Sequence, residues 1–370
     1  MKLICEKEKL LLGLNHVIRS SVGRTTNPIL EGVLITLKNN EVTLTTNDLE
    51  IGMEYVIKNV EIVEEGKTVV DSKMFSDIIR KLPDTDITIS INNKNLLLIE
   101  CEDSQYKLST MNADDFPTLP TINVEKSISL PQKTFKDMIK RTSFAVSMDE
   151  NRPVFTGCLL DVKKNSLNMV AIDGFRLAQR VAPVFSDSED FKAIVPGKYL
   201  NEVSKNLMEI NDHIKIGISK NQALFEISDC KIVTRLLEGD FLDYNKVIPS
   251  DKETRITISK SDLQGAIERA SIFSISSQEK EKKYPIKLNI NLDNVIISCT
   301  SQIGDAKEEV NINTEGKELE IGFNPKYLLD TLKAIEDDEV CLDFGSNISP
   351  CVIRPITDEK FTYMVLPMRL

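Results

Sequence analysis

The amino-acid sequence predicts an α+β protein in which one kind of domain is repeated three times along 370 residues. A helix-start signal followed by a lysine recurs at Lys73, Lys198 and Lys326, at steps of 125 and 128 residues (198 − 73 = 125; 326 − 198 = 128). Each repeat also holds segments with apolar residues at helical spacing and segments in which apolar and polar residues alternate. Helices and antiparallel strands in this combination are typical of an α+β domain with its helices on one face of a sheet.

Six segments with an apolar stripe at helical spacing predict two helices in each repeat. The stripe of the first is Leu10, Leu14 and Val17, which lie on one side of a helix. Three of the segments open a repeat, and the other three begin at Asp-Ser, Pro-Gly or Asn-Pro, which favour a helix N-terminus. The predicted helices are 7–19, 132–142 and 260–270 in the first set and 72–82, 196–208 and 325–335 in the second.

A hairpin follows each of the opening helices, because period-2 runs meet at Asn-Asn, Lys-Lys-Asn-Ser and Asp-Asn turns. Each repeat then closes with a strand and an acidic loop. Short polar segments near 121–127 and 250–254 lack apolar periodicity and are predicted linkers. The predicted domains are therefore 1–122, 128–249 and 255–370, each large enough for its own core.

Composition narrows the class of protein. No apolar run approaches the ~18–20 residues of a membrane span, and the N-terminus is charged where a signal peptide is apolar, so we expect a cytoplasmic protein. The seven cysteines include no CxxC pair and His16 and His213 are the only histidines, so we expect reduced thiols, no metal site and no cofactor. Motifs GxGxxG, GxxxxGK[ST] and GxSxG are missing from the sequence, and we expect no enzyme activity.

The six predicted helices are basic although the chain has a net charge of −11. Their lysines and arginines exceed their acidic residues by nine, so the remainder carries −20 (−11 − 9 = −20). Charged helix faces are often merely solvated, and this stays an alternative. A basic layer that recurs through most of the repeats of an acidic protein favours a polyanion bound by that layer.

The number of helices suggests how a duplex could be enclosed. Six helices at about 9 Å spacing around a ring give a circumference of about 55 Å, which leaves no room for duplex DNA. Twelve helices, from a dimer, give a circumference of about 110 Å and a diameter of about 35 Å, which admits a hydrated duplex.

Over its whole length the chain resembles the bacterial beta sliding clamps, the processivity subunits of replicative DNA polymerases. The resemblance rests on six stretches in order: GRTTNPIL at 23–30, LSTMNADDFP at 108–117, AIDGFRLA at 171–178, GDFLDY at 239–244, IGFNPKYLLDTL at 321–332 and VLPMRL at 365–370. It implies a head-to-tail homodimeric ring of six like domains around double-stranded DNA. It also implies sequence-independent contacts to phosphates and the tethering of the replicative polymerase, the clamp loader and repair proteins, without chemistry of the ring's own.

The same resemblance implies three sets of site residues. DNA contacts are expected at Arg24, Lys73, Asp149, Arg152, Pro153, Val154 and Lys198. A pocket for short QLxLF-like partner motifs is expected at Phe155, Ile172, Gly174, Phe175, Arg176, Leu177, Leu242, Lys246, Val247, Ile348, Pro350, Met364, Leu366, Pro367, Met368 and Arg369. The dimer interface is expected at Tyr106, Leu108, Ile272 and Phe273.

The final stretch is expected to divide between fold and site: Tyr363 to Val365 finish the last strand, and Leu366 to Leu370 line the partner pocket. Two other readings remain open from the residues alone. The chain could be a scaffold of triplicated domains that binds no DNA, or an enzyme with a site between repeats.

Overall fold

The computed structural model of the chain describes residues 1–20, 26–186, 188–249, 251–274, 284–358 and 360–370. Its residues form two compact units. The first unit comprises residues 1–135, 185–189 and 198–236, and the second comprises residues 136–184, 190–197 and 237–370. Among the described residues, no helix combines the length and the apolar character that crossing a membrane requires.

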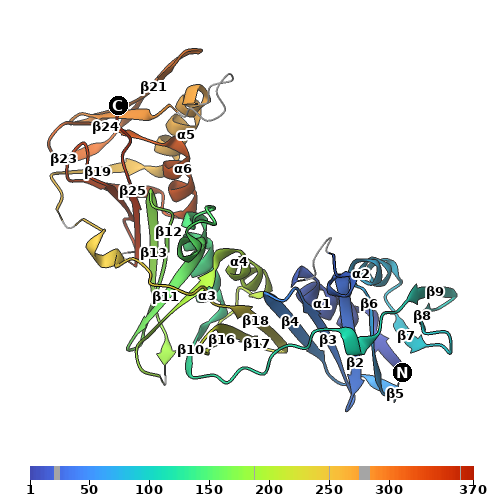
Figure 1. Cartoon of the computed structure of the whole chain (residues 1–370). Coiled ribbons are helices and arrows are strands. Elements are labelled where there is room, and N and C mark those ends of the chain that lie inside the picture. Colours follow the sequence, from blue (N-terminus) through green and yellow to red (C-terminus); the bar gives the residue numbers. More distant parts are fainter. Residues whose placement is uncertain (21–25, 187, 250, 275–283, 359) are drawn as a thin grey trace. The chain divides into compact units, whose positions relative to one another are not determined.

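The described part of the first unit contains a five-stranded and a nine-stranded antiparallel sheet (Figure 1). In the smaller sheet the order is β5 (Glu61–Glu64), β1 (Lys2–Glu6), β7 (Asp86–Ile91), β8 (Leu96–Cys101) and β9 (Ser104–Ser109). In the larger sheet the order is β14 (Phe185–Ser186), β10 (Lys126–Pro131), β16 (His213–Ile218), β17 (Gln222–Ile227), β18 (Cys230–Arg235), β4 (Ile51–Ile57), β3 (Glu41–Asn47), β2 (Gly32–Lys38) and β6 (Gly66–Asp71).

The described part of the second unit contains a nine-stranded and a four-stranded antiparallel sheet. The larger has the order β15 (Phe191–Pro196), β11 (Gly157–Lys163), β12 (Ser166–Ile172), β13 (Arg176–Pro183), β27 (Phe361–Val365), β26 (Cys351–Pro355), β25 (Glu339–Phe344), β19 (Thr254–Ser259) and β23 (Asn313–Gly316). The smaller has the order β22 (Gly304–Asn311), β21 (Asn294–Ser301), β20 (Ile286–Ile290) and β24 (Leu319–Phe323).

Each nine-stranded sheet joins strands of two different predicted repeats. In the first unit β4 pairs with β18, with Gly52 opposite Val233. In the second unit β13 pairs with β27, with Leu177 opposite Met364. Both ladders pair strands of different repeats in an uninterrupted antiparallel register, as strands within a repeat do. The compact units therefore divide the middle repeat instead of following the three predicted domains.

The six predicted helices are confirmed, with ends that differ from the predicted ones by at most two residues. They are α1 (Lys7–Val17), α2 (Ser72–Lys81), α3 (Gln132–Thr142), α4 (Gly197–Asn206), α5 (Lys260–Ala270) and α6 (Pro325–Ala334). Side chains accept hydrogen bonds at the N-termini of three of them: Asp71 from Met74 N–H at 2.6 Å, Asn324 from Lys326 N–H at 3.0 Å and Ser259 from Asp262 N–H at 3.3 Å. Such caps satisfy backbone donors that have no partner inside the helix.

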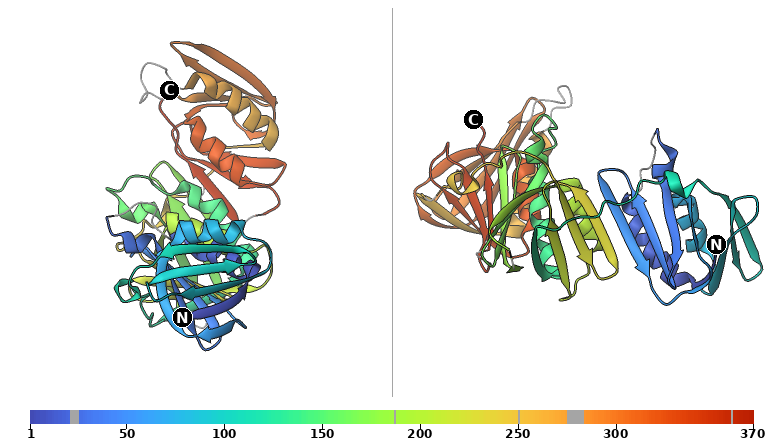
Figure 2. Two further views of the ribbon diagram at one scale, coloured as in Figure 1. Left: turned by 90° about the vertical axis from the view of Figure 1, so that its right-hand side faces the viewer. Right: turned by 60° about the horizontal axis from the view of Figure 1, so that its bottom comes forward.

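The apolar stripes of the helices face the sheets. Leu10, Leu14 and Val17 of α1 are fully buried, and this helix packs on β3 and β4. α1 and α2 pack beside each other in the first unit, and α5 and α6 do so in the second (Figure 1 and Figure 2). The predicted Asn-Asn hairpin turn is also confirmed, because Asn39 and Asn40 have positive φ angles of 53° and 58°, as a type I′ turn requires.

Removing the cap of α2 should loosen that helix. Asp71→Ala deletes the acceptor for Met74 N–H, which costs about 1 kcal/mol and should speed local amide exchange about fivefold. The measurement is hydrogen–deuterium exchange of peptides from 72–81. Asp77→Ala, in the same helix, removes an acidic side chain that caps nothing and should leave the exchange unchanged or slower. Equal exchange in both variants would contradict the capping role.

Candidate functional site

A turn at residues 173–176 connects β12 to β13 and displays an aromatic side chain. Asp173 Oδ1 accepts the backbone N–H of Phe175 at 2.9 Å and that of Arg176 at 3.0 Å. The Asp173 N–H donates to the carbonyl oxygen of Arg176 at 3.3 Å. Aspartate suits this position because its short side chain reaches the backbone two and three residues on. The turn leaves the Phe175 side chain 58% exposed.

Arg176 lies behind this turn and is only 7% exposed. Its Nε donates to Asp173 Oδ2 at 2.9 Å, and Nη1 donates to Asp330 Oδ2 at 2.6 Å. Nη2 donates to the carbonyl oxygen of Phe144 at 2.8 Å, and the guanidinium lies 4.8 Å from the centre of the Tyr327 ring. Two carboxylates compensate this buried charge. Arg176, which was predicted as part of the pocket wall, thus holds the turn against α6 from within.

An apolar cluster forms the base beneath the turn. Three predicted pocket residues, Ile172, Leu177 and Met364, are buried in it. Tyr244, also buried there, donates its hydroxyl hydrogen bond to Asp161 Oδ2 at 2.8 Å. The other buried members are Leu159, Val170 and Ile194. Partly buried residues that pack against them are Val154, Phe155, Leu237, Phe241, Val247 and Ile248.

More exposed side chains surround this base. Leu242 is 45% exposed. Lys246 reaches Asp243 with its Nζ 3.2 Å from Oδ2, and this ammonium lowers the pKa of the Asp243 carboxyl. Phe155 meets Phe241 edge to face with ring centres 6.0 Å apart. The arrangement combines a rigid apolar base with an accessible apolar and cationic rim, which suits an extended peptide with apolar anchors.

The C-terminal residues extend the site beyond the last strand. β27 ends at Val365, which confirms where the last strand was predicted to end. That the residues after it line a partner pocket stays a prediction. Leu366 N–H then donates to the Phe175 carbonyl oxygen at 2.8 Å, and Met368 N–H donates to that of Gly322 at 2.8 Å. A Cβ atom on residue 322 would lie 2.6 Å from Leu370 Cδ2, so glycine at this point lets the tail lie directly on β24.

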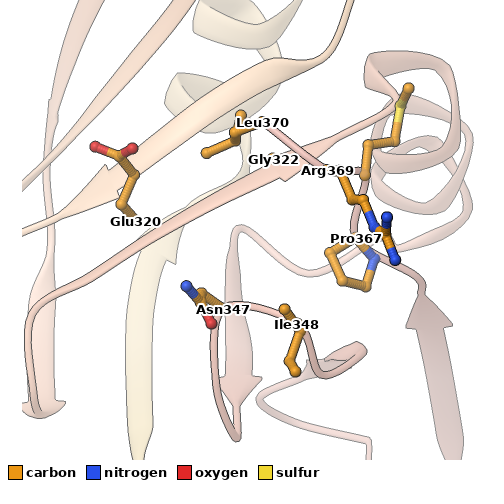
Figure 3. Close-up of a pocket in the computed structure, with 8 residues that line it drawn as sticks. Glu320, Gly322, Asn347, Ile348, Pro367, Arg369 and Leu370 are labelled. Atoms are coloured by element: carbon orange, nitrogen blue, oxygen red, sulfur yellow. The ribbon is translucent and has the colours of Figure 1, made fainter.

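A cavity of about 630 Å³ opens beside the tail (Figure 3). Four of its residues, Ile348, Pro367, Met368 and Arg369, belong to the predicted pocket; Ile348 lies on the loop before β26 and Pro350, which is half-buried, follows it. The residues that line it are Glu320, Gly322, Asn347, Ile348, Pro367, Met368, Arg369 and Leu370.

Several residues of the site were missed in the sequence. Tyr327 stacks on Phe175 with ring centres 6.1 Å apart, and Phe241 covers Phe155. Glu320, Gly322 and Asn347 complete the cavity together with Leu370, which was expected there. Phe241, Gly322 and Tyr327 could have been found from the sequence, because each lies inside a stretch that matches the family. Glu320 could not, since it lies outside these stretches on β24, the strand that Gly322 bridges to Met368 of the tail.

The predicted DNA contacts that the structure describes lie in two places, and Arg24 falls outside the described residues. Lys73 and Lys198 are exposed in the first turns of α2 and α4, and Lys198 Nζ lies 4.5 Å from the centre of the Tyr199 ring.

The other place is the loop at 148–154. Asp149 Oδ1 accepts the backbone N–H and the side-chain Nδ2 of Asn151 at 3.0 and 2.7 Å, and the first of these bonds does most to lower its pKa. Arg152 and Pro153 are exposed, whereas Val154 packs against the apolar cluster. Arg152 is therefore the cation that this loop offers.

The predicted dimer residues lie at two sheet ends. Tyr106 and Leu108 are on β9, the terminal strand of the five-stranded sheet. Ile272 and Phe273 are in the 3₁₀ helix η7 (Ser271–Ser274), which packs on β21 and β22. Ile272 is 68% exposed.

Known proteins resemble this chain along its full length. Three models of the DNA polymerase III beta subunit match it: the N-terminal domain over residues 1–120, the central domain over 129–243 and the C-terminal domain over 245–369. The beta sliding clamps of Staphylococcus epidermidis and Staphylococcus aureus are 37% and 36% identical to it, over 100% of this chain and 99% of theirs.

Solved structures agree with these matches. The DNA polymerase sliding clamp of Bacillus subtilis has a TM-score of 0.93 and 32% identity, over 100% of this chain and 99% of that one. The DNA polymerase III subunit beta of Pseudomonas aeruginosa has a TM-score of 0.95 and 29% identity, over 100% of both chains. The chain is therefore a member of the DNA polymerase III beta subunit family, the bacterial beta sliding clamps, and consists of three α+β clamp domains.

Proposed function

We propose that this chain is a sliding clamp, which encircles duplex DNA and tethers the replicative polymerase so that synthesis becomes processive. The observation that carries the proposal is the match of all three clamp domains, in order, over the whole chain. The clamp acts by topology and catalyses no reaction. It works in the cytoplasm on domains that we place at 1–122, 128–249 and 255–370.

The strand order supports a ring made of two copies. Each nine-stranded sheet joins the last strand of one repeat, β18 or β27, to a strand of the repeat before it, β4 or β13. Among the described residues, the counterpart strands that have no such partner are β9 and β22, the end strands of the five- and four-stranded sheets. Pairing β9 of one copy with β22 of another makes a third nine-stranded sheet, and doing so twice closes a head-to-tail dimer of six domains.

Side chains beside these end strands fit that seam. Tyr106 and Leu108 project from β9, and the exposed Ile272 lies with Phe273 next to β22. Open end strands of sheets invite association, and a reciprocal pairing of two copies would use both β9 and β22 of each copy.

Duplex DNA is the proposed occupant of the ring. Exposed Lys73 and Lys198 stand at equivalent positions of α2 and α4, and Arg24 and Arg152 add further cations. Contacts by such side chains neutralise phosphates and read no sequence.

The site around Phe175 is the proposed dock for QLxLF-like motifs of the replicative polymerase, the clamp loader and repair proteins. Exposed Phe175, Leu242 and Ile348 provide contact surface, while buried Leu177 and Met364 keep it rigid. Methionines such as Met368 adapt to different apolar ligands, which suits a dock shared by several partners.

A clamp should remain on closed circular DNA and leave it after linearisation. Gel filtration of complexes before and after cutting the DNA measures this. Ile272→Ala with Phe273→Ala removes the apolar side chains of the seam and should give monomers by ultracentrifugation and no retention. Leu292→Ala, an exposed apolar residue of the same domain, should keep both. Equal retention on circular and linear DNA would contradict the ring, and a chain that binds neither would favour the non-DNA scaffold.

Charge reversal on the helices should weaken DNA binding without splitting the dimer. Lys73→Glu with Lys198→Glu removes two phosphate contacts per chain, so affinity at low salt and the slope of its salt dependence should both fall, by about one slope unit per lost contact. Fluorescence anisotropy with a duplex measures this. Lys38→Glu with Lys215→Glu, on strands β2 and β16, reverses the same number of charges at exposed lysines, so it is the matched control and should bind DNA more strongly than the helix variant. If the helix variant bound DNA as well as this control, the lysines would have no special role.

Deleting residues 367–370 should abolish partner-peptide binding and leave the dimer intact. The deletion removes half of the cavity lining and the bridge of Met368 to Gly322, while β27 keeps all its residues. We expect the affinity for a QLxLF peptide, measured by calorimetry, to fall about 30-fold or more, as for an interface hot spot. Ile348→Ala should weaken binding in the same direction. Unchanged affinity in both variants would assign the tail a purely structural role.

A further inference from the structure

The first unit contains a turn that copies the one displaying Phe175. Asp48 Oδ1 accepts the backbone N–H of Glu50 at 2.9 Å and of Ile51 at 2.6 Å. The Asp48 N–H donates to the Ile51 carbonyl oxygen at 3.1 Å. These are the bonds that Asp173 makes in the second unit. The two turns occupy equivalent positions, 125 residues apart (173 − 48 = 125).

The strand pairing after the turn is copied as well. Gly52 lies opposite Val233 as Leu177 lies opposite Met364. Arg235 N–H donates to the Glu50 carbonyl oxygen at 3.1 Å, which matches the bond from Leu366 to Phe175. The backbone of the partner dock therefore exists twice in the chain, once in each unit.

A smaller cavity, of about 310 Å³, lies at the copied position. Its lining residues are Asn47, Leu49, Glu50, Gly52, Pro117, Thr118, Leu119, Pro120, Gln222, Val233 and Arg235. We name the groove walled by Asn47, Leu49, Glu50, Gly52, Gln222, Val233 and Arg235 the first cleft, and the site around Phe175 the second cleft. The cavity is the part of the first cleft that segment 117–120 leaves open.

The chain itself enters the first cleft. The segment 117–120 follows the buried Phe116, and Asn47 Nδ2 donates to the Pro117 carbonyl oxygen at 3.1 Å. Leu119 then lies directly on Gly52, where a Cβ atom would be only 1.9 Å from Leu119 Cδ2. A Cβ atom on residue 52 would force the Leu119 side chain to move, so glycine at this position allows Leu119 to lie as it does.

The rim of the first cleft is polar where that of the second is apolar. Glu50 stands at the position of Phe175, and Asn47 at that of Ile172. Arg235 stands at the position of Leu366, and its Nη1 lies 3.6 Å from Glu50 Oε1. Two apolar contacts for a ligand are thereby replaced by an ion pair at the solvent boundary.

We propose that Leu119 is an internal plug, which occupies the first cleft so that partner motifs bind only at the second. The occupant of the first cleft is thus the chain's own segment 117–120, with Leu119 in the role of a ligand's leucine anchor. Leu119 is a specificity-determining residue, because it restricts an internally repeated scaffold to one dock per chain. This inference rests on the proposed function of the second cleft.

The test counts peptides bound per chain of the full-length protein. A QLxLF peptide should saturate the wild type at one per chain in isothermal titration calorimetry. Leu119→Ala should add a second, weaker binding event. Leu119→Ala with Glu50→Phe, which also restores the aromatic residue of the second cleft, should strengthen that event. Leu49→Ala lines the same cavity without lying on Gly52 and should stay at one.

The deletion of residues 367–370 shows which cleft binds the second peptide. In that background the wild-type first cleft should bind no peptide, whereas Leu119→Ala should bind one. If neither Leu119 variant binds a second peptide while the wild type binds one, the plug is refuted and the second cleft stands. If the wild type binds none, the proposed function of the second cleft fails instead.

Discussion

The interaction on which the rest of this structure depends is the antiparallel backbone ladder between repeats. β18 pairs with β4 and β27 pairs with β13, and each pairing fuses two smaller sheets into one of nine strands. Because backbone hydrogen bonds need no particular side chain, the three repeats can differ widely in sequence and still be connected by the same kind of ladder. We call each ladder between two repeats a joint. The ladders also position the turns that carry Phe175 and Glu50, because each turn leads directly into a strand of the ladder.

Side chains then make the two joints different. At the joint in the second unit, Arg176 is buried between Asp173, Asp330 and Phe144, which leaves Phe175 displayed over an apolar base. At the joint in the first unit, the equivalent position is Ile51, which needs no carboxylate partner, and the chain folds over its own turn. A buried charge is costly unless it is paired, and Asp173 and Asp330 together pair the buried guanidinium of Arg176.

The helices and hairpins could be predicted from the sequence because their signals are local: apolar stripes, caps at Asp71 and Asn324, and the Asn39-Asn40 turn. The sharing of sheets between repeats could not, since the ladder of β4 with β18 leaves no side-chain pattern. The place of Arg176 could not be predicted either, because its partners Phe144 and Asp330 are distant in sequence. The roles of the candidate site residues in binding remain predictions, carried by family resemblance.

The unequal tethering of the ladders bears on how the proposed ring opens. The ladders of β4 with β18 and of β13 with β27 form within one chain, and the chain that connects the paired strands gives them a high effective concentration, of order millimolar. The proposed pairing of β9 with β22 has no such connection, so it would obey mass action between separate molecules. Even with equal contacts in every ladder, dilution would open this one first. In the proposed ring, chain connectivity alone would therefore decide which ladder opens.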